Sequence, residues 1–319
     1  MSAALPTLRI GTRASALALW QANHVAARLR EQPGAPEVQL VHIATAGDVQ
    51  SEVPLWQVDG RAFFTREIDR ALLQGTVDVA VHSLKDLSTQ IESGLVLAAT
   101  LARADPRDAL VSRGAATLRE LPPSARIGTS SLRRRAFLAR ARPDAVLLEL
   151  RGNVPTRLER LRRGDYDAIV LASAGLARLG LDAQVSEHLD AERFPPAVAQ
   201  GVIGVCGRAD DAATLRWLSA LDDREARLAT SAERALLRRL EGGCQVPLGA
   251  LAGVHGGTLT LHASVCARDG ARELSARGEA AAVPDEAAAL GERVAEELLA
   301  AGARELIAEQ REACGVEEP

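Results

Sequence analysis

The chain has 319 residues, of which 47% are hydrophobic, and a formal net charge of −4. This length and composition exclude a disordered or fibrous protein and suffice for two or three globular domains. The acidic balance argues against general nucleic-acid binding, and no run of about 18 apolar residues predicts a transmembrane helix. Residues 1–6 lack the basic and apolar regions of a signal peptide, so we expect a cytoplasmic protein.

The first hundred residues predict alternating strands and helices, the pattern of a doubly wound α/β lobe. Strands are expected at 8–11, 38–45, 76–83 and 95–101, and helices at 16–30 and 62–74. The second helix carries an apolar stripe of Phe64, Ile68, Leu72 and Leu73. The segment 46–61 before it has no clear periodicity, and a loop of this length is often a lid.

Only one of the 38 basic residues is a lysine, Lys85, and Asp86 follows it. The pair stands after the strand 76–83, at the edge where open α/β sheets place ligands. A lysine supplies a compact charge where a planar guanidinium does not fit. The pair indicates either a ligand site or a surface salt bridge, since such bridges are common and weak.

The next part of the chain predicts a second lobe of the same kind. Its strands at 126–128 and 147–151 each lead into a helix. The corner residues are Thr129, Ser130, Ser131, Gly152 and Asn153. Helix starts with capping hydroxyls offer N–H groups and a positive dipole end to an anion.

Arginines are concentrated in the same region. Residues 126–163 hold eleven arginines and three acids, a charge of +8 in a chain of −4. Bidentate guanidinium contacts suit carboxylates and phosphates, so we expect a small ligand with several anionic groups. Three of these arginines are expected instead on a solvent-exposed helix face, where a positive charge near the C-terminal end favours the helix dipole. They are Arg160, Arg162 and Arg163.

The remaining chain predicts a return to the first lobe and then a third domain. A strand at 198–207 returns, and helices at 213–221 and 224–240 follow. The last elements are strands at 249–254, 258–267 and 272–278 and a helix at 284–309, an antiparallel α+β pattern. We expect domain 1 to comprise 1–102 and 198–221, domain 2 103–197, and domain 3 222–319.

The cysteine spacing matches neither paired zinc ligands nor a dense disulfide framework. The cysteines are Cys206, Cys244, Cys266 and Cys314. Cys244 follows two glycines on a loop expected to be exposed, which leaves both a structural and a functional role open. The histidines form no ligand pattern, and no nucleophile elbow is present, so zinc and hydrolase functions are disfavoured.

Eight segments, in family order, resemble the porphobilinogen deaminase family, also called hydroxymethylbilane synthase. They are IGTRASALALWQA, VDVAVHSLKD, DPRDALVS, IGTSSLRRR, LRGNVPTRL, YDAIVLASAGLARLG, AVAQGVIGV and LEGGCQVPLG. They span roughly residues 8–250, whereas 255–319 match only in their strand and helix pattern. The resemblance implies two doubly wound α/β lobes like those of periplasmic binding proteins, with a cleft between them. A smaller α+β C-terminal domain with a three-stranded antiparallel sheet completes the implied fold.

The resemblance implies a monomeric enzyme that joins four porphobilinogen molecules head to tail with release of ammonia, giving hydroxymethylbilane. It implies a dipyrromethane cofactor attached to Cys244 by a thioether, Asp86 as the catalytic carboxylate, and no metal. Each pyrrole carries two carboxylates, which accounts for the arginines. The matching carboxylate-binding residues are Arg13, Ser15, Gln21, Ser83, Lys85, Thr129, Ser130, Ser131, Arg133, Arg134, Arg151, Gly152, Arg157 and Arg178, with Arg61 and Phe64 in the lid.

The sequence departs from the family pattern at Ser88, where proline is usual, at Arg61, and at Cys206, to which we assign no chemistry. A small-anion binding protein with the same architecture is the alternative function. The absence of an export signal and the glycine-flanked Cys244 count against it. A nucleic-acid role ranks third, because few aromatic residues accompany the arginines.

Overall fold

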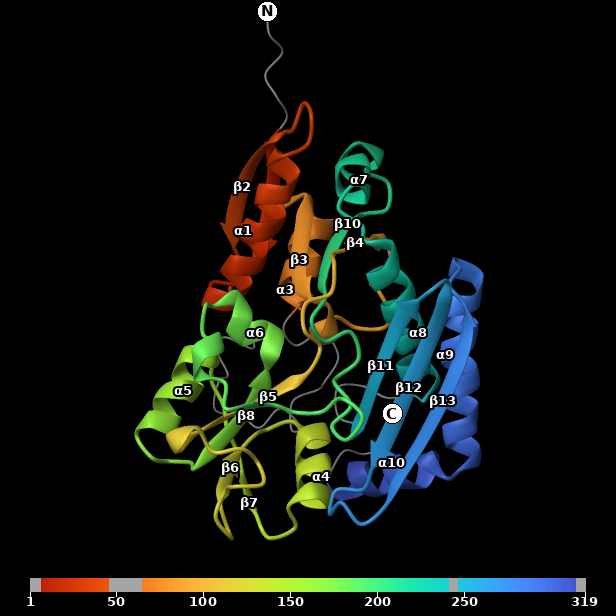
Figure 1. The fold of residues 1–319 in the computed structure, drawn as a ribbon. Helices are drawn as coiled ribbons and strands as arrows, with labels where there is room; N and C mark the ends of the chain where they lie inside the picture. Colours follow the sequence, from red (N-terminus) through yellow and green to blue (C-terminus); the bar gives the residue numbers. More distant parts are fainter. Residues whose placement is uncertain (1–6, 46–64, 241–245, 314–319) are drawn as a thin grey trace, which may run out of the picture. The chain divides into compact units, whose positions relative to one another are not determined.

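A computed structural model describes residues 7–45, 65–240 and 246–313, with side chains to residue 309. These residues fall into two compact units (Figure 1). The first comprises 7–45, 65–103 and 202–227, and the second 104–201, 228–240 and 246–313. Within the described chain, no helix is long and apolar enough to cross a bilayer.

The first unit contains a five-stranded sheet in the order β2-β1-β3-β10-β4. Its strands are β1 (Thr7–Thr12), β2 (Glu37–His42), β3 (Val79–Ser83), β4 (Leu95–Thr100) and β10 (Ile203–Arg208). β1 pairs in parallel with β2 and β3, and β10 runs antiparallel to β3 and β4. The predicted return of the chain to this sheet is confirmed. The strand starts at Ile203 instead of residue 198, because positive φ angles at Ala199 and Gly201 keep the preceding segment out of the sheet.

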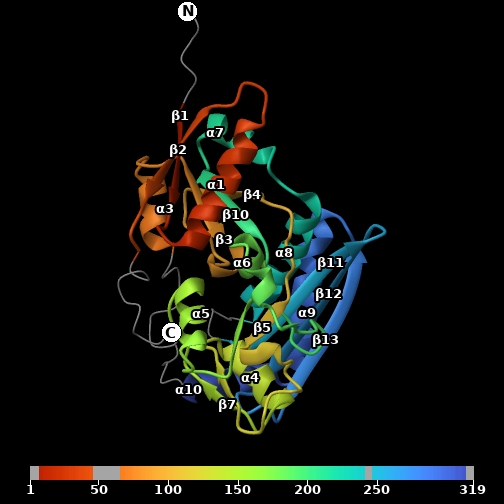
Figure 2. The same ribbon diagram turned by 60° about the vertical axis from the view of Figure 1, so that its left-hand side comes forward.

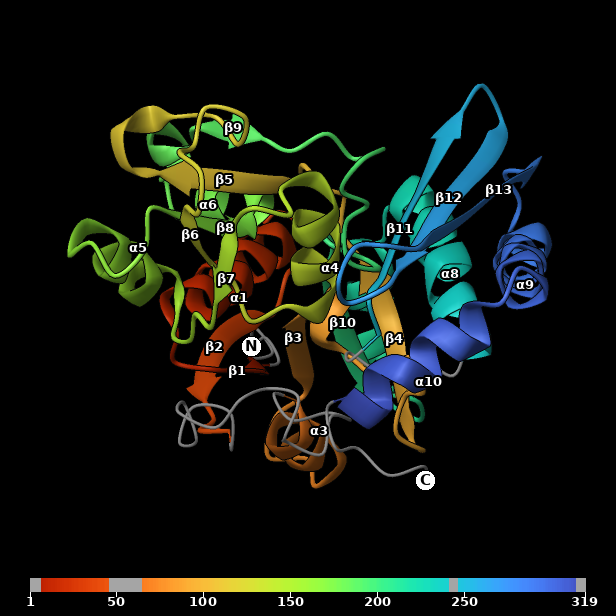
Figure 3. The same cartoon turned by 90° about the horizontal axis from the view of Figure 1, so that it is seen from below.

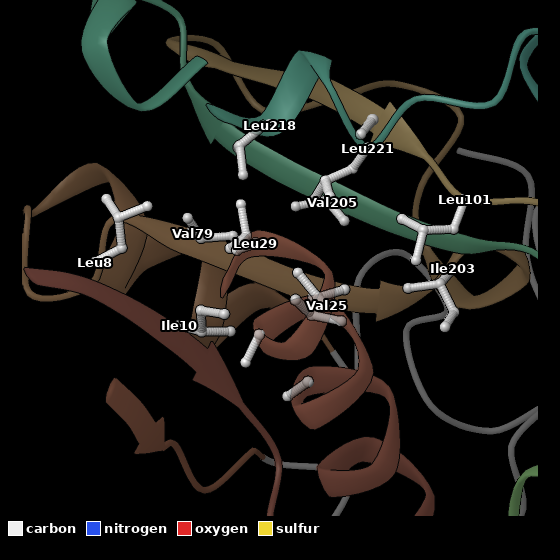
Figure 4. Close-up of a cluster of buried hydrophobic side chains, with 14 residues drawn as sticks. Leu8, Ile10, Val25, Leu29, Val79, Leu101, Ile203, Val205, Leu218 and Leu221 are labelled. Atoms are coloured by element: carbon white, nitrogen blue, oxygen red, sulfur yellow. The ribbon is translucent and has the colours of Figure 1, made fainter. Parts of the chain in front are cut away.

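Helices α1 (Ala16–Arg30) and α3 (Arg66–Leu73) cover opposite faces of this sheet (Figure 2). Two adjacent residues of β1, Ile10 and Gly11, show that the helices lie on opposite faces, because successive side chains of a strand point to opposite faces of the sheet. Ile10 packs with α1, whereas a Cβ at Gly11 would lie 3.3 Å from Ile68 of α3. Figure 4 shows the core on the α1 face, to which α7 (Ala212–Ser219) adds Leu218.

Two local predictions in the first unit are wrong. The strand expected at 76–83 begins three residues later, because Thr76 and Val77 both donate to the carbonyl of Ala71 and close the end of α3. Leu73 is 43% exposed, whereas Leu72 is fully buried. Adjacent helix positions point about 100° apart, so both leucines cannot face one core.

The second unit repeats the arrangement in the sheet β7-β6-β8-β5-β9. Its strands are β5 (Asp108–Ser112), β6 (Arg126–Gly128), β7 (Val146–Leu148), β8 (Ala168–Ala172) and β9 (Glu187–His188). β6 pairs in parallel with β7 and β8, and β5 runs antiparallel to β8. Helices α4 (Leu132–Ala141), α5 (Val154–Arg162) and α6 (Ser173–Arg178) follow β6, β7 and β8. Two similar α/β sheets are therefore confirmed, although β7 ends three residues before its predicted end.

The C-terminal part of the second unit is a three-stranded antiparallel sheet, as predicted. It consists of β11 (Leu248–His255), β12 (Thr258–Cys266) and β13 (Glu273–Ala281). Helices α8 (Arg224–Arg239) and α9 (Pro284–Ala300) lie on one of its faces (Figure 3). The single helix expected at 284–309 is wrong, because Gly302, with a φ of 99°, separates α9 from α10 (Ala303–Ala313).

Buried contacts join this C-terminal part to residues 104–201. Cys266 belongs to the core that contains Ile127. Glu233 of α8 accepts hydrogen bonds from Ala199 N at 2.6 Å and from Ala252 N at 2.8 Å. These contacts explain why both parts form one compact unit, and the predicted division into domains 2 and 3 stays a prediction.

Gly291 tests the packing of α9 on α8. Helix propensity alone predicts that Gly291→Ala stabilises the protein by about 1 kcal/mol. The added methyl group would overlap the carbonyl oxygen of Ala232, so we expect the free energy of unfolding to fall by about 1 to 3 kcal/mol. Urea unfolding measures the change, with Glu292→Ala on the exposed side of α9 as the control. A stabilised Gly291→Ala would contradict this packing.

Candidate functional site

A pocket in the first unit lies beside the start of α1 and the end of β3. The residues that line it are Arg13, Ser15, Leu17, Ala18, Gln21, Thr65, Ile68, Val81, His82, Ser83 and Asp86. Five predicted site residues therefore meet here, namely Arg13, Ser15, Gln21, Ser83 and Asp86. They come from two sequence motifs, which the parallel pairing of β1 with β3 brings to one edge of the sheet.

Buried leucines position the catalytic candidate Asp86. Lys85 and Asp86 lie in a single 3₁₀ turn, Leu84–Asp86, directly after β3. Leu84 and Leu87 are buried on either side of the pair, and the amide of Leu84 donates to the carbonyl of Val202. These anchors hold the turn against the sheet and leave the Asp86 side chain exposed at the pocket.

Two other polar residues of the pocket have structural hydrogen bonds. Gln21 is 3% exposed, and its Nε2 donates to Ser83 Oγ at 2.8 Å, which ties α1 to the end of β3. Ser15 is the N-cap of α1, and its Oγ accepts from Ala18 N at 3.4 Å. The pocket thus contains a cation, Arg13, and an anion, Asp86. The hydrogen bonds of Gln21 and Ser15 fix the backbone elements around them.

In the second unit, the three hydroxyl residues between β6 and α4 stabilise the corner itself. Ser130 Oγ donates to Leu150 O at 2.8 Å and accepts from Leu150 N at 3.1 Å. Ser131 caps α4 by accepting from Arg134 N, and Thr129 Oγ1 accepts from Ser131 N. The predicted capped corner is confirmed, and its hydroxyls hold two successive strand ends together.

The adjacent Arg133 and Arg134 share one buried carboxylate. Arg133 Nη2 lies 2.9 Å from Asp108 Oδ2, and Arg134 Nη2 lies 2.8 Å from Asp108 Oδ1. Gln200 Nε2 also donates to Asp108 Oδ1, at 2.9 Å. Burial alone would raise the pKa of Asp108, but the two guanidinium charges and these hydrogen bonds hold it well below its ordinary value. Two cations and one anion give this Asp108 cluster a net charge of +1.

Sequence reasoning missed Asp108. It stands at the start of a strand, within the segment DPRDALVS. A carboxylate entering a buried strand needs a partner, and that requirement was the available signal. The arginines that satisfy it could not be named, because Arg134 lies 26 residues away along the chain.

Three further predicted arginines belong to the corners and helices that follow β7 and β8. They are Arg151, Arg157 and Arg178. Arg157 Nε donates to Gly152 O at 2.7 Å, and Arg178 Nη2 donates to Gly201 O at 2.6 Å. Gly152 has a φ of 102°, and a Cβ there would lie 2.9 Å from Thr156, so this corner requires glycine. Burial lowers the pKa of Arg178 to about 10 and also lowers the pKa of Arg151. Burial deprives both guanidinium groups of hydration that stabilises their charge, and an anionic ligand would replace that stabilisation.

The predicted residues Arg61, Phe64 and Cys244 lie outside the described residues. The two cysteines of the described chain, Cys206 and Cys266, are both buried. Burial raises the pKa of Cys266 to about 12, which disfavours the reactive thiolate. No group of three or more His, Cys, Asp or Glu residues in the described chain could hold a metal ion.

Two family models match this sequence. The porphobilinogen deaminase dipyromethane cofactor binding domain matches residues 8–216, and the porphobilinogen deaminase C-terminal domain matches 227–300. The chain belongs to the porphobilinogen deaminase family. The second match extends the resemblance into residues that the sequence motifs left without a specific match.

Curated relatives agree with this assignment to porphobilinogen deaminases. A porphobilinogen deaminase of Roseiflexus sp. is 52% identical over 264 residues, covering 83% of this chain and 87% of that protein. One of Xanthomonas euvesicatoria is 48% identical over 283 residues, covering 89% and 93%. Among solved structures, the ancestral amino acid-binding protein AncCDT-1 is 17% identical, with a TM-score of 0.36 and coverage of 67% and 87%.

Asp108→Asn tests the Asp108 cluster. Removing one partner of a buried ion pair should lower the free energy of unfolding near pH 7 by about 3 to 5 kcal/mol. Because folding depresses the pKa of Asp108, its contribution is complete above the unfolded value of 3.8 and is lost as the pH falls through the lower folded value. The stability difference between parent and variant should therefore shrink below about pH 4.

Denaturant unfolding at several pH values measures this difference. Asp144→Asn is the control, because the Asp144 side chain is 42% exposed where it pairs with Arg142 in the same unit. Equal effects of Asp108→Asn and Asp144→Asn would show that the buried cluster contributes no special stability.

Proposed function

We propose that this protein condenses four porphobilinogen molecules head to tail, with release of ammonia, to give hydroxymethylbilane. The observation that carries the proposal is the pocket in which Asp86 and Arg13 meet at the end of β3. The family match and the relatives named porphobilinogen deaminase support it. We further propose a cytoplasmic monomer that acts on this small-molecule substrate and binds neither nucleic acid nor membrane.

The second unit fits the carboxylates of a dipyrromethane, the cofactor of the matching family domain. Arg134 Nε is buried and has no hydrogen-bond partner among the described residues. A buried donor without an acceptor is costly, and a ligand carboxylate would satisfy it. The net positive charge of the Asp108 cluster favours the same ligand. The residues predicted to hold the carboxylates are Thr129, Ser130, Ser131, Arg133, Arg134, Arg151, Gly152, Arg157 and Arg178, with Cys244 as the point of attachment.

When bound, the dipyrromethane supplies a pyrrole whose α-carbon is joined to the next substrate. The role proposed for Asp86 is electrostatic stabilisation of the reacting substrate. Loss of ammonia leaves positive charge on the substrate pyrrole, and a carboxylate fixed at the pocket stabilises that charge. Arg13 in the same pocket binds a substrate carboxylate, and Lys85 beside Asp86 adds a second cation. The turn that holds Asp86 is braced by buried leucines, so the charge is preorganised before substrate arrives.

The attachment at Cys244 can be tested by intact mass. Purified parent protein should be heavier than its sequence by one dipyrromethane, whereas Cys244→Ser should fold and have the mass of the chain alone. Cys314→Ser is the control and should keep the added mass. Cofactor retained on Cys244→Ser would refute the attachment. A parent protein without added mass and without reaction toward porphobilinogen would instead favour a small-anion binding protein.

Asp86→Asn separates catalysis from binding. The amide keeps the size of the side chain but removes the charge that faces the cationic intermediate. Electrostatic groups of this kind commonly contribute about 100-fold, so kcat for porphobilinogen should fall by at least about 100-fold. The variant should still fold and carry dipyrromethane when supplied with preformed bilane.

Steady-state kinetics of the cofactor-loaded proteins measures this loss. Asp210→Asn, at an exposed position of the first unit outside the pocket, is the matched control. Turnover of Asp86→Asn near the parent rate would assign the stabilising role to another group.

A further inference from the structure

A second polar group lies on the α3 side of the first unit's pocket, and the function proposed above does not use it. It consists of Thr65, Asp69 and His82, here called the acceptor niche. Thr65 is 1% exposed and His82 is 5% exposed, and both line the pocket with Asp86. Thr65 Oγ1, Asp69 Oδ1 and His82 Nε2 are all buried without a hydrogen-bond partner among the described residues.

The packing of α3 on β3 brings these three side chains together. Thr65 and Asp69 are one helical turn apart, since Asp69 N donates to Thr65 O at 2.8 Å, so they share a face of the helix. His82 is on the α3 side of β3, because its neighbour Val81 packs in the core beneath α1. Figures 1 and 2 show α3 beside β3.

The approach of His82 to Asp69 is too long for a hydrogen bond. His82 Nε2 lies 3.6 Å from Asp69 Oδ1, beyond the usual range for a nitrogen donor and an oxygen acceptor. Buried polar atoms in folded proteins almost always have a partner, so three without one indicate a missing partner. The niche therefore lacks hydrogen-bond partners, and two of its residues, Thr65 and His82, line the pocket from which an occupant could supply them.

The atoms of the niche determine what that occupant must be. A carboxylate oxygen, a hydroxyl oxygen and a neutral imidazole nitrogen can all accept hydrogen bonds. An occupant that donates several hydrogen bonds and carries a positive charge would satisfy all three, and an ammonium group has both properties. Porphobilinogen contains one such group, because an aliphatic amine with a pKa of about 10 is protonated at neutral pH.

We propose that the acceptor niche binds the aminomethyl ammonium group of porphobilinogen and receives the ammonia that leaves it. This inference rests on the proposed function and adds the recognition of the leaving group. The carbon–nitrogen bond breaks with its electron pair on nitrogen, and the new carbon–carbon bond takes its pair from the acceptor pyrrole. The proton lost from that pyrrole carbon converts ammonia to ammonium, so atoms and charge balance without a further reactant.

The niche also orients the substrate. Arg13 lines the same pocket as Thr65 and His82 and attracts a carboxylate, whereas Asp69, 3.6 Å from His82, attracts the ammonium group. A substrate with anions at one end and a cation at the other then has one favourable direction in the pocket. Its departing nitrogen points to α3.

Asp69→Asn and His82→Gln test the niche in the cofactor-loaded enzyme. Two quantities are measured for each protein. The first is kcat/KM for porphobilinogen, and the second is the inhibition constant of an analogue with methyl in place of aminomethyl. Loss of a charge-assisted contact should lower kcat/KM by at least about tenfold in Asp69→Asn. The inhibition constant of the analogue, which has no ammonium group, should stay within about twofold of the parent value.

Asp210→Asn is the control for loss of a carboxylate in the same unit, and the unfolding temperature shows whether each variant folds. If Asp69→Asn weakens the substrate and the analogue by the same factor, the niche has only a structural role and the proposal is overturned. If neither quantity changes, the niche binds water and the proposal is also overturned. Should His82→Gln fail to fold, Asp69→Asn alone decides. Failure of the proposed function would look different, because the parent protein itself would not consume porphobilinogen.

Discussion

The second unit depends most on the carboxylate of Asp108, which is 1% exposed and lies between two buried guanidinium groups. Neither the acid nor the arginines could be buried alone without a large desolvation cost. Arg133 also donates to the carbonyl of Pro195 and Arg134 to that of Val170, so the same side chains connect α4 to β8 and to the segment before β10. The excess positive charge that remains favours an anionic ligand at the start of α4.

Both units position their polar residues by the same means, a strand that ends at a turn held by buried groups. In the first unit, Leu84 and Leu87 anchor the turn that carries Asp86. In the second, Ser130 binds both backbone groups of Leu150 and joins two strand ends. Side chains at such corners lose little freedom when a ligand binds, because the backbone is already fixed.

The proposed substrate matches the charges of the first unit's pocket. Porphobilinogen has two carboxylates and one ammonium group, and the pocket has Arg13 and Asp86 and borders the acceptor niche through Thr65 and His82. The described part of the second unit offers several arginines, which suit the carboxylates of a growing pyrrole chain. Binding of several carboxylates by the second unit accounts for the segment of charge +8 in a chain whose net charge is −4.

Local patterns in the sequence were enough for most of the fold and for the position of the catalytic candidate. Apolar periodicity, capping hydroxyls and glycine corners act over a few residues, so α4 with its Ser131 cap and the antiparallel sheet β11–β13 were predictable. The family motifs added the identity of the site residues. Leu73 and the helix break at Gly302 were predicted wrongly, because pattern alone did not resolve which neighbour faces the core or where a helix stops.

Only the tertiary structure decided the partners of the buried polar groups. Gln200 reaches Asp108 across 92 residues of sequence, and Glu233 joins Ala199 to Ala252. The acceptor niche exists because α3 packs on β3, which no periodicity of either element specifies. Burial makes these pairings strong by removing water, and burial is a property of the packed chain. The sequence therefore determined which elements form, and packing determined which of their polar atoms meet.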